Sequence, residues 1–138
     1  MNPLVQAARG YLETPFKHQG RLPGVGLDCA GVVVCALREC GCAVQDVKGY
    51  SRIPSGDMFI RVIEEHCDRI PYSEIAEGDF LVFAFIDDPQ HIAIVTSIDP
   101  VMVIHAYSAV KRVVENSVDD FWKQKLRGCY RKRDLPWL

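Results

Sequence analysis

Two apolar patterns follow one another along this chain, and their order limits the folds that it can adopt. In the first half, apolar residues recur at helical spacing, which predicts amphipathic helices over residues 2–13, 28–40 and 55–67. From residue 80 onward, β-branched and aromatic runs predict strands over residues 80–86, 91–98, 101–107, 111–115 and 126–131. Helices followed by a meander of antiparallel strands predict an α+β fold.

Length and charge set further bounds. The 138 residues are expected to form one domain, residues 1–138. A formal net charge of -2 argues against a nucleic-acid partner, since dedicated nucleic-acid binders are strongly basic. The longest apolar stretches, residues 31–37 and 80–86, are too short to cross a bilayer, so no membrane partner is expected. The N-terminal segment lacks the basic start and apolar core of a signal peptide, which predicts synthesis in the cytoplasm.

The chain carries six cysteines. Structural disulfides are rare in a reducing compartment, so a disulfide framework is not expected. The cysteines also lack metal-ligand spacing, because Cys40-Gly41-Cys42 has no second pair to complete a tetrahedral site. We therefore expect no metal and no cofactor, and we expect most of the cysteines to be small buried apolar residues.

Cys29 differs from the other five cysteines in its position. It follows a glycine-rich loop over residues 16–27 and falls in the first turn of a predicted helix, for which Asp28 is a plausible N-cap. A helix N-terminus carries partial positive charge and N–H groups, which stabilise a thiolate and can hold an oxyanion. Cys29 therefore has two interpretations: a nucleophile, or one more buried thiol at the start of a helix.

A nucleophilic thiol needs a base and a group that orients the base. His91 opens one predicted strand and His105 lies within the next, so antiparallel pairing can bring them together. Side chains alternate across a sheet, and pairing that is symmetric about the Asp99–Pro100 bond places the two histidines on opposite faces. We therefore predict an odd-numbered connection or a β-bulge between them. The alternative is that each is a structural histidine of its strand.

Several short motifs follow one another in a recognisable order. They are Thr14-Pro15-Phe16, Asp28-Cys29-Ala30-Gly31, Gly78-Asp79, His91-Ile92-Ala93-Ile94-Val95 and Ile104-His105-Ala106. In this order and spacing, residues 11–106 resemble the NlpC/p60 family of cell-wall cysteine peptidases, whose pattern is Thr-Pro-Tyr, Asp-Cys-Ser-Gly, Gly-Asp, His-Val-Gly-Ile and His-Ala. The resemblance implies a papain-like fold, with N-terminal helices packed on an antiparallel meander sheet.

The resemblance also implies roles for three residues. Carried over to the matching positions, Cys29 is the nucleophile, His91 the general base and His105 the polar residue that orients the base. The oxyanion would be held by the Cys29 backbone N–H and a second donor. An intact set of these residues favours an enzyme, because a purely structural role places no demand on a matched set.

The chain departs from the family pattern at two positions that bear on substrate binding. The family tyrosine falls at Phe16, which has no hydroxyl, and we expect His18 to supply the missing polar group. Ala30 stands where the family has serine. Asp28 remains, and we expect it to serve as N-cap, as binder of a substrate amine, or as both.

The resemblance implies a cysteine peptidase or amidase that hydrolyses peptide bonds in the stem of peptidoglycan. His18-Gln19 after Phe16 resembles the branch found in phage tail assemblies, so other tail proteins are expected partners beside the stem peptide. A tail structural or assembly protein that keeps the fold with little activity is a second interpretation. A papain-like acyltransferase is the third, because either water or another nucleophile can attack an acyl-enzyme.

Overall fold

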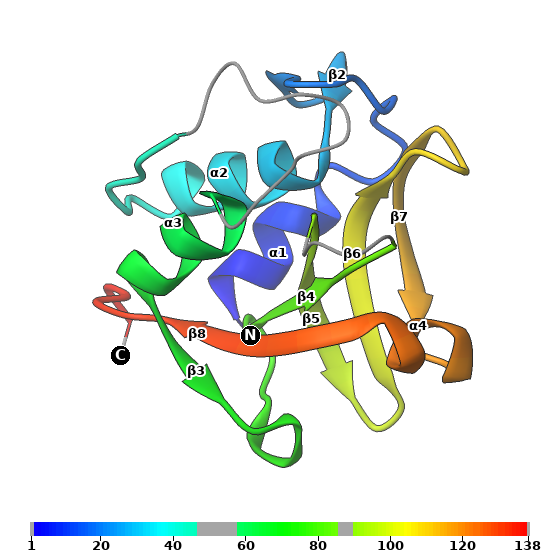
Figure 1. Ribbon diagram of the computed structural model, residues 1–138. Helices are drawn as coiled ribbons and strands as arrows, with labels where there is room; N and C mark the ends of the chain where they lie inside the picture. Colours follow the sequence, from blue (N-terminus) through cyan, green and yellow to red (C-terminus); the bar gives the residue numbers. More distant parts are fainter. Residues whose placement is uncertain (1, 47–57, 86–89, 138) are drawn as a thin grey trace.

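Three helices cover one face of a six-stranded antiparallel sheet in the computed structural model (Figure 1), which describes residues 2–46, 58–85 and 90–137. The α+β fold predicted from the sequence is confirmed. The helices on this face are α1 (Pro3–Arg9), α2 (Cys29–Glu39) and α3 (Met58–His66). In spatial order the strands are β3 (Cys67–Ile70), β8 (Leu126–Lys132), β4 (Phe80–Phe83), β5 (His91–Ile98), β6 (Val101–Tyr107) and β7 (Arg112–Ser117).

Helix α1 begins where the sequence predicts but ends earlier. The Asn2 side chain caps it by accepting hydrogen bonds from two N–H groups of the first turn, at 2.9 and 3.3 Å. The helix stops at Gly10, and the chain turns through Glu13, whose φ of 71° is left-handed. The Glu13 N–H donates to the carbonyl of Val113 on β7, so contact with the sheet replaces the last predicted helical turn.

Helix α2 agrees with its prediction, whereas α3 agrees only in part. Gly41, with a φ of 80°, follows the end of α2, as expected for a residue just beyond a helix C-terminus. Residues 55–57 of the third predicted helix lie outside the described residues. At Cys67 the chain leaves α3 and enters β3, a strand that the sequence did not predict. Its partner β8 lies far away in the chain, so no local sequence pattern predicts β3.

The glycine-rich segment contains a short hairpin that the sequence analysis treats as loop. Its strands are β1 (Arg21–Leu22) and β2 (Gly26–Leu27). This segment packs on the first turn of α2, where a Cβ on Gly31 would lie 2.2 Å from the carbonyl oxygen of Gly20. The absence of a side chain at Gly31 lets the loop backbone approach closely the first turn of α2, the helix that begins at Cys29.

The predicted meander corresponds to β4, β5, β6 and β7, which pair in sequence order. Strand β8 extends the sheet on the other side of β4 and separates it from β3. Strand β4 ends at Phe83, earlier than the predicted run, and residue 86 lies outside the described residues. Strand β7 continues to Ser117, two residues beyond its predicted end.

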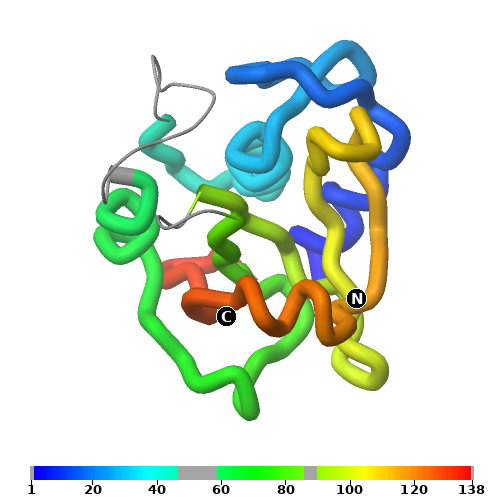
Figure 2. The backbone as a smooth tube through the Cα atoms, turned by 45° about the vertical axis from the view of Figure 1, so that its right-hand side comes forward, coloured from blue at the N-terminus to red at the C-terminus, as the bar shows by residue number. Residues whose placement is uncertain are grey.

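Each face of the sheet has its own apolar core. The core between the helices and the sheet includes Leu4, Val32, Ile94 and Ile104. On the opposite face, the short helix α4 (Asp120–Lys125) brings Trp122 against the sheet. Figure 2 shows the β5–β6 turn at the end of the sheet away from α2, so the other ends of these strands lie on the α2 side.

Candidate active site

The predicted nucleophile, Cys29, is the first residue of α2 and is half-buried. Its Sγ lies 3.8 Å from the carbonyl oxygen of Gln90, the residue that precedes β5. The backbone N–H groups of Ala30 and Ile92 favour its thiolate form. The sulfur therefore lies beside the start of the strand that opens with His91.

Burial is the largest influence on the Cys29 thiol, and it raises the pKa to about 12. The Asp28 carboxylate acts in the same direction, whereas the Ile92 and Ala30 N–H groups and the Arg21 guanidinium lower the pKa. Stabilisation of the thiolate at the helix start, which the sequence predicts, is thus present but outweighed. The resting thiol is protonated at neutral pH, so a base must take its proton as the sulfur attacks.

A β-bulge in β5 brings the two predicted catalytic histidines to one face of the sheet. Val95 and Ser97 pair with consecutive residues of β6, so Thr96 between them is an extra residue. This shift by one position reverses the alternation of side chains, and His91 and His105 point to the same side. The prediction of a bulge between the two histidines is confirmed.

Hydrogen bonds hold the extra residue in place. The Thr96 side chain is buried, and its Oγ1 donates to Glu115 Oε2 on β7 at 2.6 Å. Glu115 also accepts from Arg9 Nη2 on α1 at 3.1 Å. Glu115 pairs with Ile104, so this network lies on the face opposite to His105 and links the bulge to the first helix.

Strands β5 and β6 separate at the end that carries the histidines. Their pairing runs from the turn to Ile94 and Ile104, and beyond this pair the described residues of the two strands are not paired with each other. The Val95 N–H donates to the carbonyl of Asp79, which precedes β4. Because the N–H groups of successive strand residues point to opposite sides, the Ile92 N–H points toward β6. That N–H stabilises the Cys29 thiolate, so the start of α2 approaches the sheet where the two strands part.

Two histidines and an asparagine form a hydrogen-bonded row across β5, β6 and β7. His91 Nε2 lies 2.6 Å from His105 Nδ1, and His105 Nε2 lies 2.6 Å from Asn116 Oδ1. Burial lowers the pKa of His91 well below 6.5, and the neighbouring His105 lowers it further. Burial also lowers the pKa of His105 to about 4, against the opposing effect of its hydrogen bond to Asn116. Both rings are therefore neutral at neutral pH.

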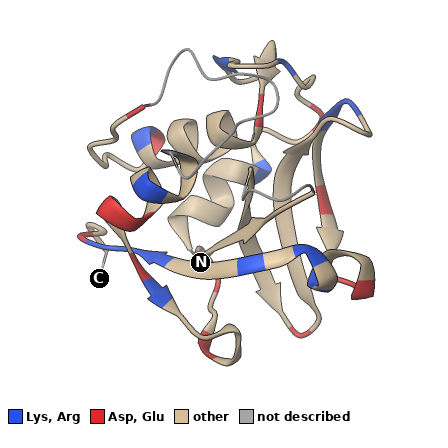
Figure 3. Ribbon diagram, in the orientation of Figure 1, with Lys and Arg blue, Asp and Glu red and all other residues tan. Residues whose placement is uncertain are grey.

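Aromatic side chains enclose the histidine pair. The ring of Trp122 lies 4.9 Å from His105 and 5.9 Å from His91, and Tyr107 stacks on His105 at 5.5 Å. Phe85 lies 5.2 Å from His91. No Lys, Arg, Asp or Glu lies on β5 or β6 (Figure 3). These rings exclude water from the imidazoles, which disfavours their charged forms.

Asp28 is buried within an ion-pair network at the start of α2. Its carboxylate accepts hydrogen bonds from the Gly31 N–H, the Gln19 N–H and Arg21 Nη1, each at 2.8 Å. Arg21 also pairs with Asp46 at 2.9 Å. The predicted N-cap role of Asp28 is confirmed. Its predicted binding of a substrate amine stays a prediction, and the Arg21 guanidinium already supplies this carboxylate with a cation.

Phe16 and His18 lie in the segment that leads to β1. The Phe16 side chain packs against the core beneath the helices, and its N–H donates to the carbonyl of Lys111 after β6. His18 is half-buried, and its Nε2 lies 3.3 Å from the side-chain nitrogen of Gln19. The backbone N–H of Gln19 in turn binds Asp28. This places the segment beside the start of α2, while the role of His18 in place of the family hydroxyl stays a prediction.

The other five cysteines do not share the position of Cys29. All six are free thiols; Cys35, Cys67 and Cys129 are buried, and Cys40 and Cys42 are half-buried. In the part of the chain that the structure describes, no cluster of three or more His, Cys, Asp or Glu is arranged to hold a metal ion. Within the same ranges, no helix has both the length and the apolar character needed to cross a membrane.

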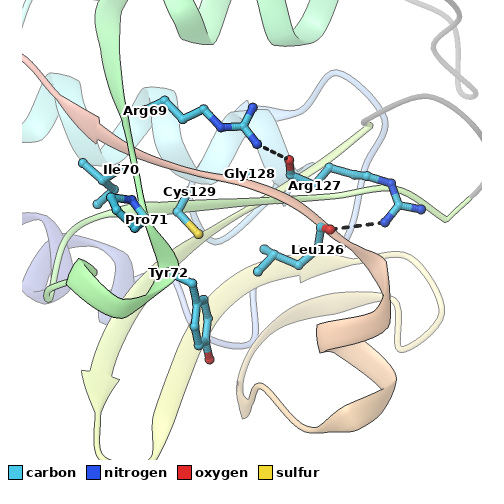
Figure 4. Close-up of a pocket in the computed structure, with 8 residues that line it drawn as sticks. All are labelled: Arg69, Ile70, Pro71, Tyr72, Leu126, Arg127, Gly128 and Cys129. Carbon is cyan, nitrogen blue, oxygen red and sulfur yellow. Dashed lines mark hydrogen bonds between the residues drawn. The ribbon is translucent and has the colours of Figure 1, made fainter.

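A separate open groove of about 300 Å³ lies along β3 and β8 (Figure 4). Its two guanidinium groups are directed to backbone carbonyls: Arg69 donates to Arg127 at 3.0 Å, and Arg127 donates to Leu126 at 3.2 Å. Its lining includes neither Cys29 nor a histidine. We therefore do not assign the groove to the active site.

Asn116 is the member of the histidine row that the sequence analysis did not single out. It belongs to no motif and lies near the end of β7. With His105 paired to Val114, Asn116 falls two residues further along the same face, within reach of the His105 ring. The register between β6 and β7 is the signal that finds it, and no motif within β7 gives that register.

Comparison with known proteins agrees with the observed fold. The model of the NlpC/P60 family matches residues 13–131. A search of curated proteins gives no match. An NlpC/P60 family protein from Bacillus cereus superposes with a TM-score of 0.72 at 19% identity, over 97% of this chain and 40% of that protein. This chain therefore spans less than half the length of that relative.

Two further solved structures share the fold. The NlpC/p60 domain of the peptidoglycan hydrolase SagA has a TM-score of 0.68 and 24% identity, over 95% of this chain and 99% of that domain. The peptidoglycan hydrolase RipB from Mycobacterium tuberculosis has a TM-score of 0.67 and 17% identity, over 96% of this chain and 63% of RipB. Because the family model spans most of its residues, the chain belongs to the NlpC/P60 family.

Proposed function

We propose that this chain is a cysteine peptidase or amidase that hydrolyses peptide bonds in the stem of peptidoglycan. The observation that carries the proposal is the position of the Cys29 sulfur against the residues on either side of His91, where β5 and β6 part. A thiol beside a hydrogen-bonded histidine pair supplies the parts that nucleophilic catalysis needs: a nucleophile, a base and a group that orients the base.

In the proposed reaction, His91 takes the thiol proton as the Cys29 sulfur attacks the substrate carbonyl carbon. The oxyanion that forms is stabilised by N–H groups at the start of α2. His91 then gives the proton to the departing amine, and a thioester remains on Cys29. Water, deprotonated by His91, attacks the thioester and releases the carboxylic acid product with the free thiol. His105 keeps the His91 ring in position throughout.

Two similar structures support peptidoglycan as the substrate. SagA and RipB are both named as peptidoglycan hydrolases, and family membership supports a cell-wall peptidase. We place the stem peptide beside the start of α2, with Asp28, Phe16 and His18 as its predicted contacts. Arg21, paired with Asp28, lies at the same end of the helix.

The histidine row favours an enzyme over a purely structural tail protein. Burying two imidazoles costs free energy that packing alone does not require, and aliphatic residues would fill the same space without that cost. Association with a phage tail is part of the proposal and rests on the sequence alone, on His18-Gln19. An acyltransferase uses the same groups and differs in the final acceptor.

The test is digestion of purified peptidoglycan with the wild type, Cys29→Ala and the matched control Cys42→Ala. The wild type and Cys42→Ala are expected to release stem fragments, identified by mass spectrometry, whereas Cys29→Ala releases none. Release by Cys29→Ala, or no release by the wild type, would contradict the proposal. Products joined to an added amine in place of hydrolysed ends would identify a transferase.

A further inference from the structure

We propose that Asn116 is a positioning residue that sets the protons on both histidine rings, so that His91 keeps an unprotonated Nδ1 for the Cys29 thiol. This inference rests on the proposed function, because it concerns the base of that reaction. It concerns a residue on β7, one strand further from Cys29 than His105.

The orientation of the Asn116 amide is fixed by two hydrogen bonds. Its Nδ2 donates a hydrogen bond to the backbone carbonyl of Ser117 at 3.1 Å, which directs Oδ1 to His105. An amide oxygen can only accept a hydrogen bond. The 2.6 Å contact therefore requires that His105 carries its proton on Nε2.

The position of the proton on His105 in turn determines the position of the proton on His91. A neutral imidazole has a single N–H, so the Nδ1 of His105 is an acceptor. The 2.6 Å contact between the rings then requires His91 to donate from Nε2. His91 is neutral as well, so its Nδ1 is left with a lone pair, as a general base requires.

Without an acceptor at the far end, the row has a second arrangement. His105 could carry its proton on Nδ1 and donate to Nε2 of His91, and His91 would then hold its own proton on Nδ1. That arrangement keeps both rings neutral and keeps the hydrogen bond between them, but it removes the base. Asn116 excludes it, because its oxygen cannot donate to His105.

The titratable groups that face the pair come from each neighbouring element. Tyr107 of β6 lies against both histidine rings, and Phe83 of β4 and Trp122 of α4 contribute neutral rings. The Cys29 thiol of α2 lies beside Gln90 and Ile92, the neighbours of His91. Lys125 of α4 lies over the Phe85 ring, at 6.0 Å from its centroid. Glu115 of β7 is paired with Arg9 on the opposite face of the sheet. A new charge at residue 116 would therefore act on the histidine row directly.

The first test observes the ring protons by NMR and needs no activity. Long-range proton–nitrogen correlations of the wild type are expected to show both histidines protonated at Nε2. Asn116→Leu, which has no acceptor, is expected to show a mixture of the two arrangements. Protonation of His105 at Nδ1 in the wild type, or unchanged tautomers in a folded Asn116→Leu, would overturn the proposal.

The second test follows the base through the rate at which iodoacetamide alkylates Cys29, read on the Cys29 peptide by mass spectrometry as a function of pH. Asn116→Leu is expected to lower the rate at neutral pH by about tenfold. Asn116→Asp keeps an acceptor and adds a negative charge, which favours protonation of the histidine row. It should retain the alkylation rate at neutral pH and raise the pH at which the rate falls in acid by about one unit. Ser117→Ala, on the same strand, should match the wild type.

A merely structural Asn116 predicts a different pattern. Both variants would then change the melting temperature, while the tautomers and the acid limb would stay as in the wild type; that result would overturn the proposal. Failure to cleave peptidoglycan would contradict the proposed substrate and leave the NMR and alkylation results to decide the role of Asn116.

Discussion

Burial determines the protonation of both proposed reacting residues. The Cys29 thiol has its pKa raised to about 12, and burial lowers the pKa of His91 well below 6.5. At neutral pH the pair is therefore a neutral thiol beside a neutral imidazole, and not a thiolate with an imidazolium. The proton must move during the attack itself, which makes the position of the base more important than the charge of the resting sulfur.

The resting state can be tested by ultraviolet absorbance of the thiolate. The difference spectrum between the wild type and Cys29→Ala is expected to show no thiolate at neutral pH, because burial disfavours the charged sulfur. A thiolate signal from Cys29 that titrates below neutral pH would contradict this account. Cys42→Ala provides the matched difference spectrum for a half-buried thiol outside the site.

At the scale of elements, the site depends on an irregularity of one hairpin. The bulge at Thr96 places His91 and His105 on one face, and the separation of β5 from β6 beyond Ile94 lets the start of α2 approach the strand ends. A regular hairpin of the same sequence would bury one histidine on each face. The geometry of the site is thus set some distance away from the reacting atoms, where Thr96 binds Glu115.

Replacing the buried hydroxyl of the bulge should therefore reduce activity. Thr96→Val removes the 2.6 Å hydrogen bond to Glu115 and leaves its carboxylate with fewer donors. We expect the free energy of unfolding to fall by about 1–2 kcal/mol, together with a loss of kcat, since the register that aligns the histidines is weakened. Chemical denaturation and peptidoglycan digestion measure the two effects.

The control separates stability from alignment. Ile75→Val trims the core on the α4 face and should cost about 1 kcal/mol of stability while leaving kcat unchanged. If Thr96→Val retained the kcat of Ile75→Val at equal stability, the bulge would not be what aligns the histidines.

At the scale of the whole molecule, the two buried histidines link folding to pH. His105 has its ordinary pKa of 6.5 when unfolded and a pKa of about 4 when folded. Between these values the unfolded chain binds more protons than the folded chain, so stability falls as the pH falls through this window. Above pH 6.5 the full contribution of the neutral His105 to the free energy of unfolding is present, and below pH 4 no further stability is lost through this residue.

This linkage predicts a measurable loss of stability in acid. His105 alone should account for a fall of about 3 kcal/mol in the free energy of unfolding between these two pH values, and His91 acts in the same direction. Denaturant unfolding of the wild type and His105→Asn at a series of pH values measures it. The two stability curves should converge as the pH falls; parallel curves would show that His105 does not titrate differently on folding.

Much of this architecture follows from short local patterns and from the alternation of side chains along strands. Asn2 and Asp28 cap their helices as short polar side chains before a helical run should, and the alternation of strand residues is enough to require a bulge between His91 and His105. These features depend on neighbouring residues in the chain, and sequence reasoning reaches them.

The rest depends on contacts between distant segments. Strand β3 exists because β8 returns to pair with it, and Asn116 reaches His105 only in the observed register. The pKa of Cys29 rises mainly because burial disfavours its charged form, and that burial depends on the approach of β5 to the start of α2, which no local pattern in the sequence shows. The identity of the proposed reacting groups could therefore be predicted from the sequence, whereas their charge in the resting state could not.

The acyl group that we assign to Cys29 can be observed with a stem-peptide p-nitrophenyl ester. An activated ester acylates quickly, so the breakdown of the thioester should limit turnover and nitrophenol should appear in a burst. Acylation of Cys29 predicts a burst of about one equivalent per chain, no burst with Cys29→Ala, and a thioester on the Cys29 peptide after acid quench. A burst that persists in Cys29→Ala, or an acyl group on another residue, would contradict it.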